Sequence, residues 1–340
     1  MKKSGVWGLL LIGLILTFFF VSACSREEKI EIKKEDGVTV VYNPKKPAPP
    51  RGVPSTLSLK EELVLGKMGN EETMLLDPRA VDVDQNGNIV AAEQQPDGMS
   101  FSGWLPLLGG ASLPGGYVTG VSRNAGMLDI FVVGTDGFPY TAGRAAGQAN
   151  WGGWWAMPKN SQFPQGAPFT AVSRSTDKLD VFGADMGGNI VTAAWAPGAP
   201  SWGGWWPISN GKTSAGGYVA SVCADTDVID VFVVGTDGNI YRSSWSPATH
   251  PWSAWVSLAA AGLRFSVGNR VSAVSPVKGK IDIACVDEAG RVFVTSLELP
   301  LRTFGGFTQI GTRTTIPNGM VSLFARKNGE TQAYMIGRDR

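Results

Sequence analysis

An aromatic tetrapeptide recurs five times at nearly constant spacing, and this repeat constrains the fold more than any other feature of the chain. Each copy begins and ends with Phe or Trp and encloses small residues. The copies span residues 101–104, 151–154, 202–205, 252–255 and 304–307, so successive copies start 50, 51, 50 and 52 residues apart. Such a period is typical of propellers and arrays, in which each repeat is one supersecondary unit that needs its neighbours. The chain is therefore predicted to be a repeat protein.

Every repeat also carries β-rich runs in a fixed order. The first runs are 118–123, 169–174, 219–224, 271–276 and 321–326, and the second are 128–133, 179–182, 229–234, 281–285 and 332–336. An Asp-Gly or similar turn then leads to a third run, a strong hairpin signal because glycine accepts the positive φ of such turns. With the aromatic segment as a fourth strand, each repeat has the size of one propeller blade. We therefore predict an all-β fold, a β-propeller of four-stranded antiparallel blades.

The chain ends suggest how such a ring closes. The last repeat lacks a third and a fourth strand, whereas residues 86–104 supply a turn, a third strand and an aromatic segment. Pairing these N-terminal strands with the C-terminal first and second strands gives five blades and leaves no long exposed sheet edge. Residues 80–84 also read as a second strand. Either one copy is displaced, or the chain is a fragment of a larger ring.

Charge and motif content argue against several functional classes. The net charge is +1 with scattered Lys and Arg, which disfavours nucleic-acid partners. His250 is the only histidine, so we expect no metal site, and no Ser-His-Asp arrangement except one built on that residue. We expect no cofactor and no enzymatic activity. A repeated aspartate follows the start of the second run and suits one structural hydrogen bond per blade: Asp129, Asp180, Asp230 and Asp282.

The N-terminal residues 1–24 have the features of an export signal: a Lys-Lys leader, an apolar run, and Val-Ser-Ala before Cys24. The last four residues resemble a bacterial lipobox, which implies lipidation of Cys24 and a membrane anchor in the cell envelope. Ser25 suits the outer membrane. An ordinary signal peptide or a single membrane anchor is the alternative. Residues 25–75 are predicted to be a charged, proline-rich tether, and residues 76–340 the repeat domain. Cys223 and Cys285 occupy non-equivalent positions and are predicted to be free thiols.

Two parts of the chain resemble different families. Residues 26–93, through the runs at 36–44, 57–63 and 77–90, look like the opening of lipoprotein six-bladed propellers with NHL-type repeats. From about residue 99 onward, the Trp-Gly-Gly-Trp-Trp, Leu-Asp-Val-Phe and Gly-Thr-Asp-Gly-Asn-Ile-Tyr elements resemble the PLL-type bacterial fucose-binding lectins. That resemblance implies a seven-bladed propeller with sugar sites between blades. The repeats are more distantly similar to the five-bladed tachylectin and tectonin propellers.

Sugar binding requires particular side chains. Pyranoses place C–H faces on aromatic rings and give their hydroxyls to short polar groups. The second aromatic position of the motif is aromatic in all five repeats and is predicted to pack between blades, whereas the third position varies. We therefore favour aromatic residues near the loop that enters the motif, with polar neighbours. These candidates are Trp151, Trp195, Trp202, Trp245 and Trp252, with Asn189, Asn239 and Arg242 as hydroxyl partners.

The sequence thus predicts a surface-tethered, multivalent carbohydrate-binding propeller for fucosylated or related glycans. In the alternative, every tryptophan is core and the protein is a non-enzymatic scaffold for protein partners. A glycan-acting enzyme, which needs two opposed carboxylates, is the least favoured class.

Overall fold

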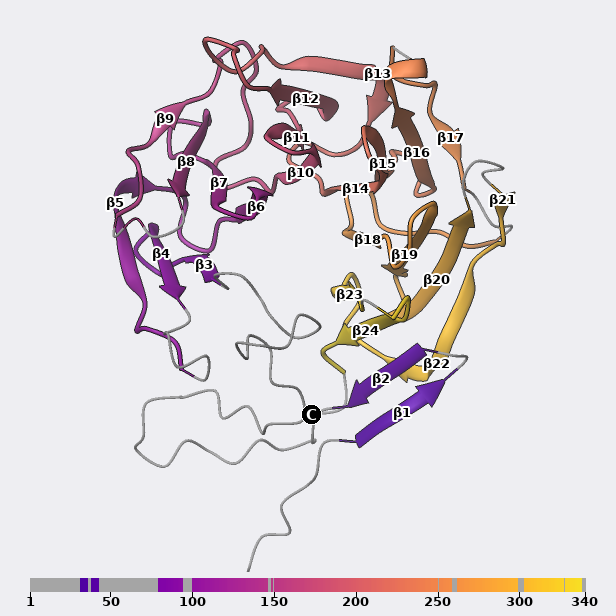
Figure 1. Ribbon diagram of the computed structural model, residues 1–340. Helices are drawn as coiled ribbons and strands as arrows, with labels where there is room; N and C mark the ends of the chain where they lie inside the picture. The colour runs from indigo at the N-terminus through magenta and orange to yellow at the C-terminus, as the bar shows by residue number, and fades with distance from the viewer. Residues whose placement is uncertain are drawn as a thin grey trace, which may run out of the picture.

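A computed structural model describes residues 31–35, 38–42, 79–93, 100–145, 148, 150–249, 251–258, 262–298, 303–326 and 328–337. Their strands form six sheets, blades 1 to 6, which follow one another around a ring (Figure 1). The expected signal peptide, Cys24, most of the tether and His250 lie outside the described residues. Within the described part of the chain, no helix is long and apolar enough to cross a membrane.

The sheets follow the repeats. Blade 1 contains β3 (Arg79–Val83), β4 (Asn88–Glu93) and β5 (Leu105–Ala111). Blade 2 contains β6 (Val118–Asn124), β7 (Met127–Val133), β8 (Pro139–Ala145) and β9 (Trp155–Ala156). Blade 3 contains β10 (Thr170–Ser175), β11 (Lys178–Ala184), β12 (Asn189–Trp195) and β13 (Trp206–Lys212). Blade 4 contains β14 (Val219–Asp225), β15 (Val228–Val234), β16 (Ile240–Trp245) and β17 (Val256–Ser257), with the short 3₁₀ turn η1 (Pro247–Thr249) after β16.

Blade 5 contains β18 (Val271–Val274), β19 (Lys280–Val286), β20 (Arg291–Glu298), β21 (Thr303–Phe304) and β22 (Thr308–Thr314). Blade 6 combines the last two strands of the chain with the first two: β23 (Val321–Ala325), β24 (Thr331–Met335), β2 (Val38–Tyr42) and β1 (Glu31–Glu35). All pairings are antiparallel except β2 with β24, where Thr39 lies opposite Gln332 and Val40 opposite Ala333.

Local sequence explains the hairpins inside each blade. The turn between the second and third strands carries glycine at positive φ, for example Gly137 at 77° and Gly238 at 76°. Glycine is favoured there because it has no Cβ. The aspartate before that glycine accepts a backbone hydrogen bond, as Asp237 does from the Asn239 N–H at 3.0 Å. The predicted Asp-Gly hairpins are confirmed.

Stacking of neighbouring blades builds the core. Each of five hydrophobic clusters joins residues of two consecutive blades, from blades 1 and 2 to blades 5 and 6. The second strand of a blade packs against the neighbouring blade on each face, so it is buried on both faces: in β15, residues 229–234 are all buried, and all of them except Asp230 are apolar. Phe131, Phe182 and Phe232 are fully buried at equivalent positions. Burial of one such side chain contributes roughly 1.5–3 kcal/mol.

The predicted closure needs correction. Residues 80–83 lie in β3 and pair with β4, so this segment builds blade 1 instead of completing the C-terminal repeat. The C-terminal strands take β2 and β1 as partners, and the strands group into six sheets rather than five. The N-terminal and C-terminal parts of the chain do pair, because β2 lies between β1 and β24. Among the described residues, no strand of blade 1 pairs with blade 6.

The aromatic segment also differs from the prediction, because in blades 2 to 4 it is a loop rather than the fourth strand. The fourth strands start directly after the second aromatic residue, at Trp155 in β9 and Trp206 in β13. One glycine of the segment still bonds to the third strand, as Gly203 N–H does to the Ala194 carbonyl at 2.9 Å. A Cβ on Gly152 would lie 2.5 Å from the Trp155 ring. The glycine therefore leaves room for the third aromatic residue to fold back over the loop.

Candidate functional site

An arginine and an aspartate on the first hairpin of a blade form the base of the site. Arg123 Nε in β6 lies 3.0 Å from Asp129 Oδ2 in β7. One blade further, Arg174 in β10 pairs with Asp180 in β11. Both aspartates are 6% exposed. Because a buried carboxylate needs a hydrogen-bonding or charged partner, each pair fixes its guanidinium at one place on the blade.

The guanidinium of each pair reaches the next blade. Arg123 Cζ lies 4.9 Å from the centre of the Trp195 ring, at the end of β12. Arg174 Cζ lies 5.5 Å from the Trp245 ring, at the end of β16. These cation–π contacts join blade 2 to blade 3 and blade 3 to blade 4. The same arginine–tryptophan contact thus occurs at both positions between blades.

The first tryptophan of the aromatic loop forms a second wall. Trp202 meets Phe131 edge to face at 5.5 Å, and Trp252 meets Phe182 in the same way at 5.7 Å. In each pair the phenylalanine belongs to the second strand of the preceding blade. Both indoles stay partly exposed. Each ring is thus held by the core on one side and left accessible on the other.

Between blades 3 and 4 these residues enclose a cavity of about 590 Å³. Its walls also include Trp206, Pro207, Ser209, Pro251 and Ala194. Trp206 is 39% exposed although its ring is large and apolar. Two or three accessible indoles around one buried ion pair are typical of small-molecule sites, which combine apolar walls with few polar groups. We call this cavity site 3/4.

The position between blades 2 and 3, site 2/3, carries the same residue types. The set is Arg123, Asp129, Trp155, Trp195 and Trp202. Trp155 is 56% exposed, as expected for the counterpart of Trp206.

The position between blades 4 and 5 has lost this arrangement. Ala224 replaces the arginine of the first strand, and Asp230 pairs instead with Arg242 of its own blade. Leu297, Phe304 and Val256 stand where the other sites carry tryptophan. The expected hydroxyl partner Arg242 is 6% exposed inside blade 4. Among the described residues, the full set of one arginine, one aspartate and three tryptophans therefore occurs at site 2/3 and at site 3/4.

The eight sequence candidates separate into groups. Site 2/3 brings together Trp195 and Trp202, and site 3/4 brings together Trp245 and Trp252. Trp151 packs against the core between blades 1 and 2, where Arg144 takes the position of Trp195. A tryptophan at the loop position is therefore not sufficient to form the site.

The two asparagines lie elsewhere. Asn189 Nδ2 donates to the carboxylate of Asp185 at 2.8 and 3.0 Å, and Asn239 Nδ2 donates to Asp237 at 2.5 Å. Both hold the turn at the far end of the third strand. At about 3.3 Å per residue, Asn189 is about 20 Å from Trp195 along β12. The structure does not bring the asparagines to the tryptophans.

The arginine–aspartate pairs and the third aromatic position were not among the residues predicted to bind sugar. Asp129 and Asp180 were expected to make structural bonds, and they do, but their partners also face the sites. A signal was present: both repeats with Trp at the third aromatic position, Trp155 and Trp206, also have Arg at the end of the first run. The other first run that ends in Arg, 321–326, belongs to the last repeat, which has no aromatic segment after it. Co-occurrence of these residue types marks the same two blades.

Packing between blades explains Trp154, Trp205 and Trp255. Trp205 stacks on Phe169 at 5.4 Å inside the cluster of blades 2 and 3. Trp255 donates its Nε1–H to the Ile208 carbonyl of the preceding blade at 2.8 Å. The prediction that the second aromatic position packs between blades is confirmed at Trp154, Trp205, Trp255 and Phe307. It is wrong at Trp104, which is 55% exposed. Cys223 and Cys285 are free, also as predicted.

The buried carboxyl groups make both sites sensitive to pH. Burial raises the pKa of Asp129 and of Asp180 to about 6, and the facing guanidinium offsets only part of this effect. The carboxylates therefore gain protons just below neutral pH. Protonation removes the negative charge of Asp129 beside Arg123 and of Asp180 beside Arg174, although Arg174 keeps a longer contact of 3.5 Å to Asp227. Among the described residues, no group of three or more His, Cys, Asp or Glu is arranged to hold a metal ion.

Comparisons with known proteins give the fold. No family of known proteins matches the sequence, and no curated protein matches it. Among solved structures, the BP39L lectin from Burkholderia pseudomallei is similar with a TM-score of 0.64 and 21% identity, over 77% of this chain and 78% of the lectin. A fungal lectin from Aleuria aurantia, described as a six-bladed β-propeller, aligns with a TM-score of 0.46 and 14% identity, over 76% of this chain and 86% of the lectin. The first likeness supports the propeller fold.

Proposed function

We propose that the protein is a carbohydrate-binding propeller whose sugar sites are site 2/3 and site 3/4. The observation that carries the proposal is the repeated set of accessible tryptophans around an arginine fixed by a buried aspartate. Indole faces suit the C–H face of a pyranose. A guanidinium has five N–H donors, so Arg123 beside Asp129, and Arg174 beside Asp180 and Asp227, both retain donors for sugar hydroxyls.

The walls of site 3/4 favour a sugar with one apolar edge. Pro207 and Pro251 stand beside the indoles of Trp206 and Trp252, and Ala194 adds a small apolar surface. A 6-deoxy sugar such as fucose offers a methyl group to such walls and its hydroxyls to Arg174. The resemblance of the repeats to PLL-type lectins supports the same choice. Fucosylated or related glycans are therefore the proposed ligands, and no chemical step on them is proposed.

Location and valency complete the proposal. The Val-Ser-Ala-Cys motif supports export and lipidation at Cys24, with the propeller displayed on a bacterial outer membrane. Two weak sites on one chain, and many chains on one surface, give avidity without new contacts. The proposed role is adhesion to glycan-bearing surfaces.

A glycan array tests this function. The full chain is purified in a zwitterionic detergent without a sugar headgroup and compared with the double variant Trp202→Ala/Trp252→Ala. Fucosylated glycans should be retained by the wild type and lost by the double variant. The matched control is Val256→Ala, at the degenerate position between blades 4 and 5, which should bind like the wild type. Absence of binding by a folded, monodisperse wild type would contradict the proposal and favour the protein scaffold.

A further inference from the structure

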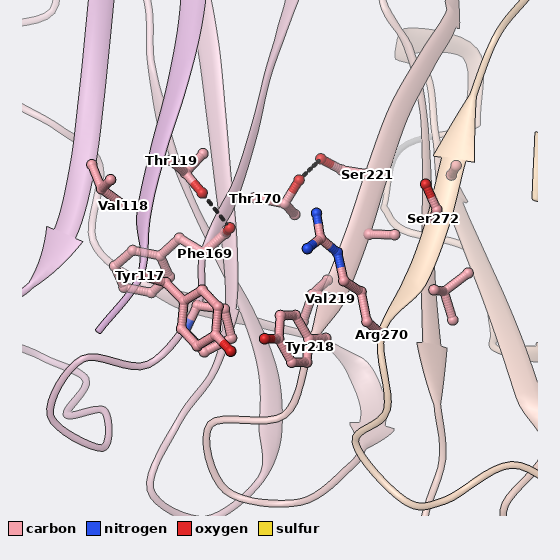
Figure 2. Close-up of a pocket in the computed structure, with 14 residues that line it drawn as sticks. Tyr117, Val118, Thr119, Phe169, Thr170, Tyr218, Val219, Ser221, Arg270 and Ser272 are labelled. Carbon is pink, nitrogen blue, oxygen red and sulfur yellow. Dashed lines mark hydrogen bonds between the residues drawn. The ribbon is translucent and has the colours of Figure 1, made fainter. Parts of the chain in front are cut away.

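The first strands of four consecutive blades line a second cavity, near the centre of the ring and apart from the sites between blades. Its volume is about 300 Å³, and its lining comes from residues 117–119, 168–170, 218–221 and 270–273 (Figure 2). This volume lies at the lower end of the range for small-ligand sites, roughly 300–1,000 Å³. Tyr117, Pro168, Tyr218 and Arg270 hold equivalent positions just before β6, β10, β14 and β18. Equivalent positions of the four repeats therefore contribute different side chains to the wall of this cavity.

Aromatic rings and hydroxyl groups form its walls. The rings of Tyr117 and Tyr218 meet edge to face at 5.2 Å. Thr170 Oγ1 and Ser221 Oγ are hydrogen-bonded to each other at 2.9 Å. Burial raises the pKa of Tyr218 above its ordinary value, so its hydroxyl stays protonated and able to donate. The cavity thus offers one ring face and several hydroxyls.

One cation points into this space. Figure 2 shows the guanidinium of Arg270 directed between the Tyr218 ring and the Thr170–Ser221 pair. Its Cζ lies 5.8 Å from the centre of the Tyr218 ring, and its Nη1 contacts Met320 Sδ at 3.2 Å. Met320 is apolar and does not neutralise the charge.

The charge of Arg270 lacks an acidic partner among the described residues. No Asp or Glu lines the cavity, and none of the described carboxylates forms an ion pair with Arg270. By contrast, Arg123, Arg174, Arg242 and Arg291 are each paired with an aspartate. A half-buried guanidinium without a carboxylate favours an anionic ligand, which can bind its planar fork with two hydrogen bonds.

We propose that this central cavity binds a small polyhydroxylated carboxylate, namely an acidic sugar of the hexuronate class. The carboxylate pairs with the Arg270 guanidinium. The sugar hydroxyls exchange hydrogen bonds with Thr170, Ser221 and the tyrosine hydroxyls, and one face of the ring contacts Tyr218. The ligand is either a free sugar acid or the terminal residue of an acidic glycan, since the two share this chemistry. This site does not depend on the function of sites 2/3 and 3/4.

Calorimetric titration tests the proposal on the full chain in zwitterionic detergent. The matched probes are D-galacturonate and D-galactose, which differ at C6 alone. Galacturonate should bind at least tenfold more tightly than galactose. Arg270→Gln should weaken galacturonate about ten- to hundredfold, because a charge-assisted hydrogen bond is worth about 1.5–3 kcal/mol. Arg270→Lys, which keeps the charge but loses the fork, should give an intermediate loss.

Two control variants separate this site from the rest of the molecule. Arg264→Gln removes an exposed arginine of the neighbouring loop that donates to the Leu263 carbonyl, and it should bind galacturonate like the wild type. Trp252→Ala should do the same, because Trp252 lines site 3/4. Trigalacturonate binding more tightly than the monomer would identify a glycan terminus, and equal binding a free acid; both support the site. No galacturonate binding by the folded wild type, equal binding of galactose, or unchanged binding by Arg270→Gln would overturn it.

Discussion

Gly211→Ala should destabilise the propeller by wedging blade 3 away from blade 4. A Cβ at residue 211 would lie 2.4 Å from Trp255 Nε1, 2.5 Å from Cε2 and 2.6 Å from Cζ2. The indole cannot retreat freely, because its Nε1–H donates to the Ile208 carbonyl at 2.8 Å. Gly211 is not among the glycines with positive φ. The new methyl group therefore acts by steric overlap and not by backbone strain.

The magnitude follows from three contributions. Overpacking of a well-packed contact costs about 1–3 kcal/mol, and weakening of the indole hydrogen bond costs about 1 kcal/mol. Replacing glycine by alanine in a strand returns roughly 0.5–1 kcal/mol through the unfolded chain. The free energy of unfolding should thus fall by about 2 kcal/mol. Urea denaturation followed by tryptophan fluorescence measures this loss.

A matched variant and a double-mutant cycle make the test specific. A Cβ on Gly153 meets nothing within 4 Å, so Gly153→Ala should leave stability within about 0.5 kcal/mol of the wild type. In a Trp255→Leu background, Gly211→Ala should cost far less than in the wild type, because the overlapping ring is gone. The reasoning would be refuted if Gly211→Ala were as stable as Gly153→Ala, or if the loss were the same with and without Trp255.

Three further predictions concern the charged and polar groups. Burial raises the pKa of Asp129 and Asp180 to about 6 in the folded protein, so the folded state binds protons more tightly than the unfolded state. The free energy of unfolding should therefore increase as pH falls from about 7 to 4, because of these two groups. Over the same interval sugar affinity should drop, and Asp180→Asn should reduce both pH effects in denaturation and titration series. Asn189→Ala should lower the free energy of unfolding by about 1 kcal/mol without changing sugar affinity, because its side chain serves a turn. Arg242→Gln should destabilise by about 3–5 kcal/mol in the same denaturation assay, since it leaves the carboxylate of Asp230 buried without its cation.

The repeat made much of the fold predictable. The hairpin turns, the apolar second strands and the packing role of Trp205 and Trp255 depend on residues close in sequence or at equivalent positions. Blade 6 was not predictable in this way. Its parallel pairing of β2 with β24 joins residues almost 300 positions apart, as Thr39 and Gln332 show. Local patterns carry no information about such a partner.

The candidate site was predictable in part for the same reason. Trp245 and Trp252 belong to one repeat, and their loop position pointed to them. Arg174 and Asp180 lie in the preceding repeat, so their place beside Trp245 follows from the stacking of blades. Asn189 was predicted beside the tryptophans because it lies in the same repeat as Trp195. It does share a strand with Trp195, but six residues of extended chain place it at the far end of the blade.

The most direct test of the sugar sites is a crystal structure of the protein with methyl α-L-fucoside. We predict one pyranose at site 3/4, with a C–H face on Trp206 or Trp252 and a hydroxyl within hydrogen-bond distance of Arg174. A second should occupy site 2/3 beside Trp202 and Arg123, and none should bind between blades 4 and 5. Well-ordered sites 2/3 and 3/4 that remain empty at saturating fucoside, or a sugar bound only at other surfaces, would contradict the account.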